Sequence, residues 1–97
     1  MMDMNSKNKK QKLPKWFDGL HYPEGETVVN PFSNEEFYLN RTELSIYDLI
    51  KGTEHIFGMH QATQPNKPLD PKLLKDFERA LSWFRKYSPK AYMVLLD

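Results

Sequence analysis

The sequence has no cysteine, few glycines and no long hydrophobic run. Without cysteine the chain forms no disulfide, no thiolate metal site and no cysteine nucleophile. Its four glycines lie in neither a Gly-rich phosphate loop nor a Gly-x-Ser-x-Gly elbow, so nucleotide hydrolysis and serine-hydrolase chemistry lose support. The longest apolar stretch covers only residues 91–96, whereas a transmembrane helix needs roughly 20 residues. We therefore expect a soluble protein without a membrane partner.

The chain is also short, with 97 residues of which 39% are hydrophobic. A chain of this size buries roughly 60% of its unfolded surface, which suffices for one core but leaves little room for an enclosed catalytic cleft. We expect a single domain without a cofactor, a small-molecule substrate or an enzymatic activity. A small enzyme with an unrecognised site is an alternative.

Charge is distributed unevenly, although the net charge is only +1. The first 15 residues contain one acidic side chain, Asp3, and five lysines: Lys7, Lys9, Lys10, Lys12 and Lys15. Residues 1–12 also lack aromatic side chains and any apolar repeat, so they cannot offset the entropy cost of ordering. We therefore expect a flexible basic arm at residues 1–12 and one folded domain at residues 13–97.

A β-hairpin is predicted at residues 26–39. The segments Glu26–Asn30 and Glu35–Leu39 are rich in Val, Phe, Tyr and Thr, and a turn-forming Pro-Phe-Ser-Asn stretch separates them. The last residue of this stretch, Asn34, is of one of the few non-glycine types that tolerate a positive φ. In the second segment Phe37 and Leu39 share one face, which we expect to cover the core.

Two amphipathic helices are predicted to follow. The first covers Thr42–Gln61 with Thr42 as its N-cap, and the second begins at the cap Asp70 with Pro71 in its first turn. The apolar stripe of the first helix contains Ile46, Leu49, Ile50, Thr53, Ile56, Phe57 and His60. The stripe of the second helix contains Leu73, Leu74, Phe77, Ala80, Leu81, Phe84 and Tyr87.

The last residues, 90–97, are apolar enough for either a short helix or an edge strand. Ser88 followed by Pro89 repeats the cap-then-proline pattern of the second helix, which favours a helix. The hairpin and the helices each have one apolar face and little stability alone. The sequence therefore predicts a small α+β domain, in which a hairpin packs on two long helices and a short C-terminal helix or strand.

No metal site or paired catalytic acid is expected. His55 and His60 are five residues apart, which separates them by about 140° around a helix, so the two rings cannot meet on one ion. Neighbouring carboxylates such as Glu35 and Glu36 point to opposite faces of a strand.

Aromatic residues give the main indication of a binding function. The chain has 2 Trp, 5 Tyr and 6 Phe, more than one small core needs to enclose. Tyr47 and Trp83 lie outside the apolar stripes and Phe32 lies in the predicted turn, so we expect some of these side chains to be exposed. The alternative is that they pack under the arm and the loops. Exposed aromatic side chains are common anchors of protein interfaces. The favoured prediction is a non-enzymatic protein that binds a protein partner or itself through them.

The basic arm indicates an alternative function. Lys7, Lys9, Lys10, Lys12 and Lys15 can contact phosphates, which predicts nucleic-acid binding that weakens with salt. Arginine and interleaved aromatic residues are missing from the arm, so sequence-specific reading of bases is not indicated. A solubilising tail is the simpler explanation of the same lysines.

Several segments resemble those of short uncharacterised proteins encoded by tailed phages of marine bacteria. They are Leu13–Gly19 (LPKWFDG), Asn30–Glu36 (NPFSNEE), Glu43–Ile50 (ELSIYDLI) and the ending that runs from Trp83–Lys86 (WFRK) through Ala91–Asp97 (AYMVLLD). The resemblance implies a viral accessory protein or virion component that works by contact with another macromolecule, in the cytoplasm of a host cell or in the particle. It assigns no catalytic or ligand residue.

Overall fold

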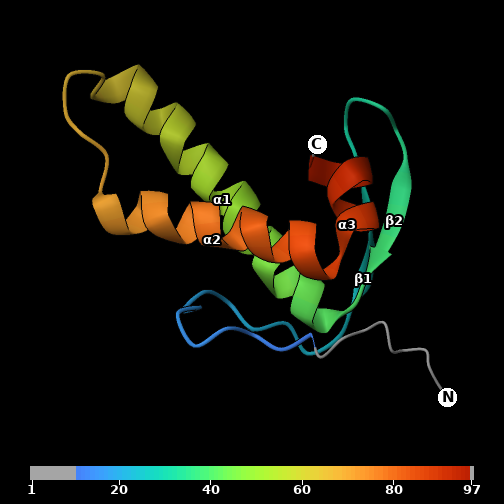
Figure 1. The fold of residues 1–97 in the computed structure, drawn as a ribbon. Coiled ribbons are helices and arrows are strands. Elements are labelled where there is room, and N and C mark those ends of the chain that lie inside the picture. Colours follow the sequence, from blue (N-terminus) through green and yellow to red (C-terminus); the bar gives the residue numbers. More distant parts are fainter. Residues whose placement is uncertain (1–10, 97) are drawn as a thin grey trace, which may run out of the picture.

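A computed structural model describes residues 11–96. Its elements, in chain order, are the strands β1 (Glu26–Val29) and β2 (Glu36–Leu39), the helices α1 (Arg41–Thr63), α2 (Pro71–Tyr87) and α3 (Pro89–Ala91), and the π-helical turn η2 (Tyr92–Leu96). The fold is α+β, as predicted, with one antiparallel hairpin and a short C-terminal helical segment beside two long helices (Figure 1). Within the described range, none of the helices is long and apolar enough to cross a membrane.

The hairpin forms where the sequence predicts it. β1 and β2 pair antiparallel with Glu26 opposite Leu39. Leu39 is fully buried and Phe37 is half-buried, whereas Tyr38 between them is exposed, so the predicted alternation of faces is confirmed. A Cβ on Gly25, next to β1, would collide with the Leu39 carbonyl oxygen, so the close approach of the chain at this point requires glycine.

Asn30 holds the turn between the strands. Its Oδ1 accepts from the N–H groups of Phe32 over 2.8 Å and Ser33 over 3.3 Å. Its Nδ2 donates to the carbonyl oxygen of Val94 in η2 over 2.9 Å. Asn34 adopts the left-handed conformation expected of it, with a φ of 66°, and its N–H donates to the Asn30 carbonyl oxygen. One side chain thus connects the hairpin tip to the C-terminal turn.

Helix α1 is capped by Asn40 rather than by Thr42. The Asn40 side chain accepts from the Glu43 N–H over 2.9 Å, and the Glu43 carboxylate accepts from the Asn40 N–H over 2.9 Å. This reciprocal pair is a capping box, which satisfies two backbone donors at once. The prediction of Thr42 as N-cap is wrong because the residue three positions after it, Ser45, offers no carboxylate to complete such a box.

Helix α2 begins as predicted. Pro71 occupies its first position, and Asp70 Oδ1 accepts from the Lys72 N–H over 3.0 Å. The second cap-then-proline pattern behaves differently, because Ser88 makes no capping bond and instead donates its hydroxyl to Glu43 over 2.7 Å. The residues after it are nevertheless helical, as that pattern favours, with α3 continuing directly into η2.

The core lies where α1 and α2 pack together beside β2 and the C-terminal segment (Figure 1). The apolar side chains of the core that have no exposed surface are Leu39, Ile46, Ile50, Ala80, Phe84 and Ala91. Burial of Ile46, Ile50 and Thr53 confirms the inner face predicted for the first part of α1. Ala80 and Phe84 confirm that of α2.

Beyond the core, α1 and α2 continue as a pair that we call the helical arm (residues 54–75), which projects to one side (Figure 1). Phe57 and Phe77 pack edge to face at its base, with ring centroids 5.1 Å apart. Ile56 is 48% and Leu74 is 40% exposed. These two stripe residues therefore lie outside the core, because the N-terminal segment meets the arm on another side of α2, where Asp18 pairs with Lys72.

The N-terminal segment lies against the helices from Gln11 onward. Gln11 Nε2 donates to Glu43 over 3.1 Å and to the Tyr87 carbonyl oxygen over 2.9 Å, and Gln11 Oε1 accepts from Asn40 over 2.7 Å. Gln11, which the prediction assigned to the arm, is therefore bonded to the start of α1 and the end of α2. Residues 1–10 of the predicted arm lie outside the described residues.

Candidate functional site

Of the predicted aromatic anchors, Phe32 at the hairpin tip is 96% exposed, whereas Tyr47 is 9% and Trp83 is 7% exposed. The prediction that Tyr47 and Trp83 lie on the surface is wrong, because each helix is covered on more than the side that faces the other. Every residue from Glu43 to Tyr47 is buried, and Trp83 shares a hollow with residues 12–16. Only the turn residue is placed as an exposed anchor should be.

The two buried aromatic side chains behave as core residues. The Trp83 ring packs against Phe84 and Tyr87, with centroids 5.2 and 5.4 Å away. Burial raises the pKa of the Tyr47 phenol above its usual value, since desolvation disfavours the phenolate. The pKa of Tyr22 is raised as well, by burial and by the hydrogen bond that its hydroxyl donates to Asp48 over 3.1 Å.

Glu43 lies at the centre of a buried polar cluster. Its Oε2 accepts from the Ser88 hydroxyl over 2.7 Å and from Gln11 Nε2 over 3.1 Å, while its Oε1 accepts from the Asn40 N–H. A buried carboxylate needs such bonds to replace the water it has lost. Because the donors belong to three separate segments of the chain, the cluster fastens Gln11 and Ser88 to the start of α1 and is structural.

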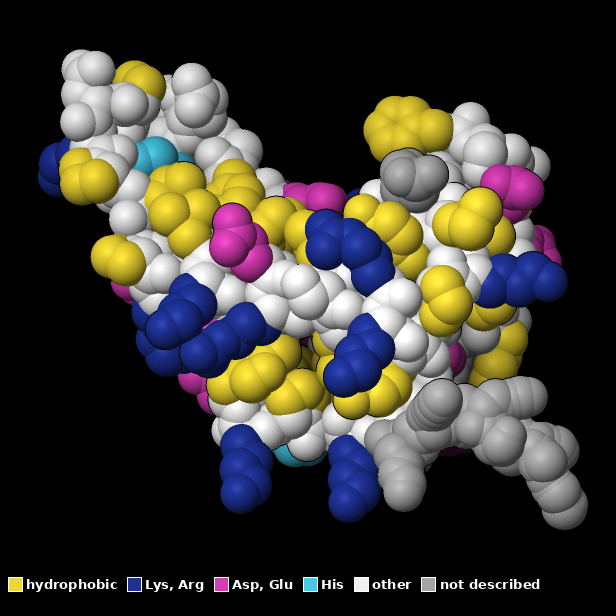
Figure 2. Space-filling view, viewed as in Figure 1, with side chains coloured by type: hydrophobic (Ala, Val, Ile, Leu, Met, Phe, Trp, Pro, Cys, Tyr) yellow, Lys and Arg dark blue, Asp and Glu magenta, His cyan; other side chains and the backbone are white. Residues whose placement is uncertain are grey.

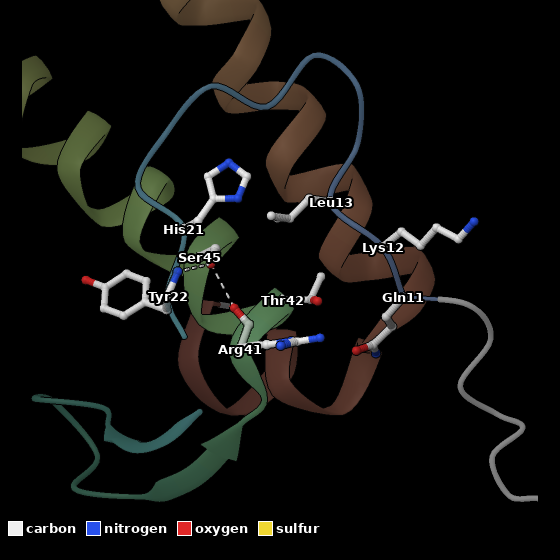
Figure 3. Close-up of a pocket in the computed structure, with 8 residues that line it drawn as sticks. All are labelled: Gln11, Lys12, Leu13, His21, Tyr22, Arg41, Thr42 and Ser45. Atoms are coloured by element: carbon white, nitrogen blue, oxygen red, sulfur yellow. Dashed lines mark hydrogen bonds between the residues drawn. The ribbon is translucent and has the colours of Figure 1, made fainter. Parts of the chain in front are cut away.

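A hollow of about 450 Å³ lies beside this cluster, between the N-terminal segment and α1 (Figure 3). It is lined by Gln11, Lys12, Leu13, His21, Tyr22, Arg41, Thr42 and Ser45. The Ser45 hydroxyl donates to the Arg41 carbonyl oxygen over 2.8 Å and accepts from the Tyr22 N–H over 3.0 Å. The His21 ring points away from Ser45 (Figure 3) and packs on Phe17 at 5.3 Å. Serine and histidine here brace the chain and are not arranged as nucleophile and base.

A second hollow, of about 460 Å³, lies between α1 and α2 at the base of the helical arm, and we call it the apolar groove. Its lining residues are Phe57, Leu74, Phe77, Glu78, Leu81, Ser82 and Arg85. Figure 2 shows hydrophobic side chains gathered on this side of the arm, with acidic and basic side chains beside them.

Four lining residues of the groove form one stripe along α2. Leu74, Glu78, Leu81 and Arg85 recur at intervals of four, three and four residues, which places them on one face of the helix. Glu78 and Arg85 are about 10.5 Å apart along the helix axis, and Leu81 lies between them. The Arg85 guanidinium lies over the Tyr92 ring, 5.2 Å from its centroid. The groove therefore has apolar walls and one charge of each sign.

A different exposed side of α2 carries a row of basic side chains. At 100° per residue the row falls within an arc of about 60° and contains Lys72, Lys75, Arg79 and Lys86. Figure 2 shows Lys and Arg side chains along α2, with hydrophobic side chains between them. Lys72 pairs with Asp76 at 2.7 Å and with Asp18 at 3.3 Å, and these hydrogen bonds raise the pKa of its ammonium group.

Trp16 lies against this row. The Arg79 guanidinium sits over its indole, 5.8 Å from the ring centroid, and the ring lines three hollows on this side of the molecule. The hollow of about 490 Å³ is lined by Lys12, Leu13, Pro14, Lys15, Trp16, Trp83 and Tyr87. The predicted phosphate-binding residues Lys12 and Lys15 thus lie beside Trp83. The other predicted lysines, Lys7, Lys9 and Lys10, lie outside the described residues.

Histidines and carboxylates are scattered. Among residues 11–96, no three side chains of the types His, Cys, Asp and Glu are grouped to hold a metal ion. His60 Nε2 donates to the Lys67 carbonyl oxygen over 2.6 Å, across the loop that joins α1 and α2. This bond makes His60 a brace at the end of the helical arm.

Sequence reasoning missed both exposed sides of α2. The stripe predicted for the second helix includes Leu74, Phe77 and Leu81, but a stripe of this kind does not show where a second layer ends. No binding role was predicted for the four basic residues. The intervals of three, four and seven residues that separate them were the signal for a row.

Comparison of this chain with protein-family models, with curated proteins and with solved structures finds no match. Its own surfaces therefore carry the functional argument.

Proposed function

We propose that this chain is a non-enzymatic interaction protein, which pairs with a second copy of itself through the apolar groove. The observation that carries the proposal is the order of charges on α2, where Glu78 and Arg85 lie symmetrically about the step from Leu81 to Ser82. When two copies of α2 pack antiparallel about a two-fold axis at this step, Glu78 of each copy faces Arg85 of the other. A surface with this pattern is complementary to itself.

Apolar side chains around the groove supply the attraction. Leu74 and Ile56 are each close to half exposed, and Met59 farther along α1 is 54% exposed. Removing apolar surface of this kind from water is worth about 25 cal/mol for each square ångström. Ser82, at the proposed axis, is small enough to let two helices approach closely. Pairing would thus cover side chains that the isolated chain leaves in water.

Charge complementarity favours a second copy over another kind of occupant. A groove rimmed by one sign of charge would select an oppositely charged helix, whereas one acid and one base placed symmetrically about an axis satisfy each other in an antiparallel self-pair. Phe32 lies on the hairpin tip, away from α2, and its role as a protein-binding anchor stays a prediction. A role as a viral accessory or virion component, in a host cytoplasm or a particle, also stays a prediction from the resemblance.

Charge reversal tests the pairing directly. We expect wild-type protein to show a concentration-dependent dimer in sedimentation velocity and in light scattering after gel filtration. Glu78→Arg and Arg85→Glu, each alone, should give monomers because like charges then face each other. The double variant should recover the dimer, and an equimolar mixture of the two single variants should form a heterodimer with both ion pairs restored.

Lys75→Glu is the matched control, since it reverses a charge on the same helix but on the basic side. It should leave the dimer intact. The proposal fails if wild-type protein stays monomeric at every concentration, or if the double variant and the mixture remain as monomeric as the single variants.

A further inference from the structure

We infer that the basic side of α2, together with the hollow beside Trp16, binds single-stranded nucleic acid. This inference goes beyond self-association, because none of the basic residues that it uses lines the apolar groove. The two surfaces meet at Glu78 and Ser82, which line both the groove and a hollow beside Trp16. We call this surface, made by Lys12, Lys15, Trp16, Lys72, Lys75, Arg79 and Lys86, the basic face.

The basic face offers charges along a line. Lys72 and Lys86 are separated by about 21 Å along α2, at 1.5 Å per residue. Within residues 11–96, two cations of this face form ion pairs closer than 4.0 Å. Lys72 pairs with Asp76 and Asp18, and Arg79 pairs with Asp76. Four further lysines there have no such partner in that range: Lys12, Lys15, Lys75 and Lys86. Lysines without an acidic partner attract a chain of phosphates and release the counterions condensed on it.

Aromatic surface lies within the same face. Trp16 is half-buried and Trp83 is nearly covered, so Trp83 and Tyr87 form the inner wall of the hollow and Trp16 its accessible side. Lys12 and Lys15 line the hollow beside these rings. A base that stacks on an aromatic ring gains about 1–3 kcal/mol in single-strand binding proteins, whichever base it is. The hollow therefore suits an unpaired base, and the lysines can contact the phosphates on either side of that nucleotide.

Asp76 positions the arginine of this face. Its carboxylate is buried, lies 2.7 Å from Lys72 Nζ and 3.7 Å from Arg79, and so holds both cations from beneath. Arg79 in turn lies over the Trp16 indole. The Trp16 ring and the Arg79 guanidinium are thus stacked, and a nucleic-acid base can stack on them in turn.

A single strand fits these features better than a duplex or an acidic protein. In a duplex the bases are stacked inside and cannot reach Trp16 without being flipped out. A peptide made only of acidic residues would satisfy the lysines but would leave the aromatic hollow unused. DNA and RNA share the chemistry of phosphates and bases, and the experiment therefore includes both.

The test is fluorescence anisotropy with labelled oligo(dT) and oligo(U) of about 20 nucleotides, titrated with the full chain at 50 and 200 mM KCl. Lys75→Gln/Lys86→Gln should raise Kd at 50 mM KCl about tenfold or more and reduce the salt slope by about 1.4, because two phosphate contacts are lost. Trp16→Leu should raise Kd roughly tenfold with little change in salt slope, whereas Trp16→Phe should retain most of the affinity.

Lys67→Gln/Lys90→Gln is the matched control, since it removes the same charge from exposed positions outside the basic face. It should change Kd much less than Lys75→Gln/Lys86→Gln does. The lysine variants keep the test decisive even where Trp16→Leu loses its folded circular-dichroism signal. A second comparison is Lys7→Gln/Lys9→Gln/Lys10→Gln, which tests the lysines that precede Gln11.

Four results would overturn the inference. These are absence of binding at 50 mM KCl, tighter binding of duplex than of single strand, competition by poly-glutamate as effective as that by oligonucleotide, and loss of binding confined to the Lys7/Lys9/Lys10 variant. The third result would assign the face to an acidic protein, and the fourth would assign binding to the N-terminal lysines alone.

Discussion

The same two long helices behave differently at their two ends. Ile50 is fully buried in the core, whereas Ile56, six residues later in α1, is 48% exposed in the helical arm. Both fall on the apolar stripe that the sequence predicts, so periodicity alone cannot tell them apart. The difference is that the hairpin, the N-terminal segment and the C-terminal turn pack around the core end, while on the arm the N-terminal segment meets α2 at Lys72, away from Ile56 (Figure 1). An apolar stripe predicts which side of a helix faces other elements. How deeply that side is buried depends on how many elements pack against it.

The largest effect is expected from truncating one isoleucine in the core and one in the helical arm. Ile50→Ala should lower the free energy of unfolding by about 2–5 kcal/mol, because it leaves a cavity in a packed interior. Ile56→Ala removes the same atoms from a half-exposed position and should cost less than about 1 kcal/mol. Urea denaturation followed by circular dichroism measures both values. Equal losses would mean that the arm is as well packed as the core.

A smaller effect is expected at the start of α1, which belongs to the core end. Asn40→Ala removes half of the capping box and should lower the free energy of unfolding by about 1 kcal/mol. Thr42→Ala should change it by no more than about 0.5 kcal/mol, because Thr42 is not the cap. Thermal and urea unfolding of the pair check the assignment. A larger loss for Thr42→Ala would return the cap to the position that the sequence suggested.

The smallest effect concerns the buried phenol of the core end and appears only at alkaline pH. Burial raises the pKa of Tyr47 above 10.0, so the folded state holds this proton more tightly than the unfolded chain does. The resulting stability is fully present below about pH 10 and is lost as the pH rises through the folded pKa. We expect Tyr47→Phe to match wild type in urea unfolding at neutral pH and to lose less stability at about pH 11. If wild type and Tyr47→Phe have the same stability at both pH values, this phenol makes no contribution.

Features set by neighbouring residues could be predicted from the sequence. Asp70 with Pro71 fixed the start of α2, and Asn34 marked the left-handed position of the turn. The cap of α1 was misplaced because Asn40 and Thr42 both fit a cap locally, and the choice depends on the carboxylate of Glu43. Local patterns therefore identified the elements and most of their ends.

Features set by distant contacts could not be predicted. The Glu43 cluster needs Gln11 and Ser88, which lie 32 and 45 residues away along the chain. The basic row of α2 can be read from its spacing, but its position beside Trp16 depends on how the N-terminal segment folds back. The same fold-back covers Trp83, which explains why an aromatic residue outside the stripe is not an exposed anchor.

The bond between Asn30 and Val94 has a consequence for the order in which the protein forms. It joins residues 64 positions apart, and the bond from Gln11 to the Tyr87 carbonyl oxygen joins residues 76 positions apart. During translation the early partners emerge long before the late ones exist, and contacts over such separations also carry a high loop-closure cost. We therefore expect the Gln11 bond to form only after residue 87 has emerged from the ribosome, and the Asn30 bond to Val94 only after residue 94 has emerged.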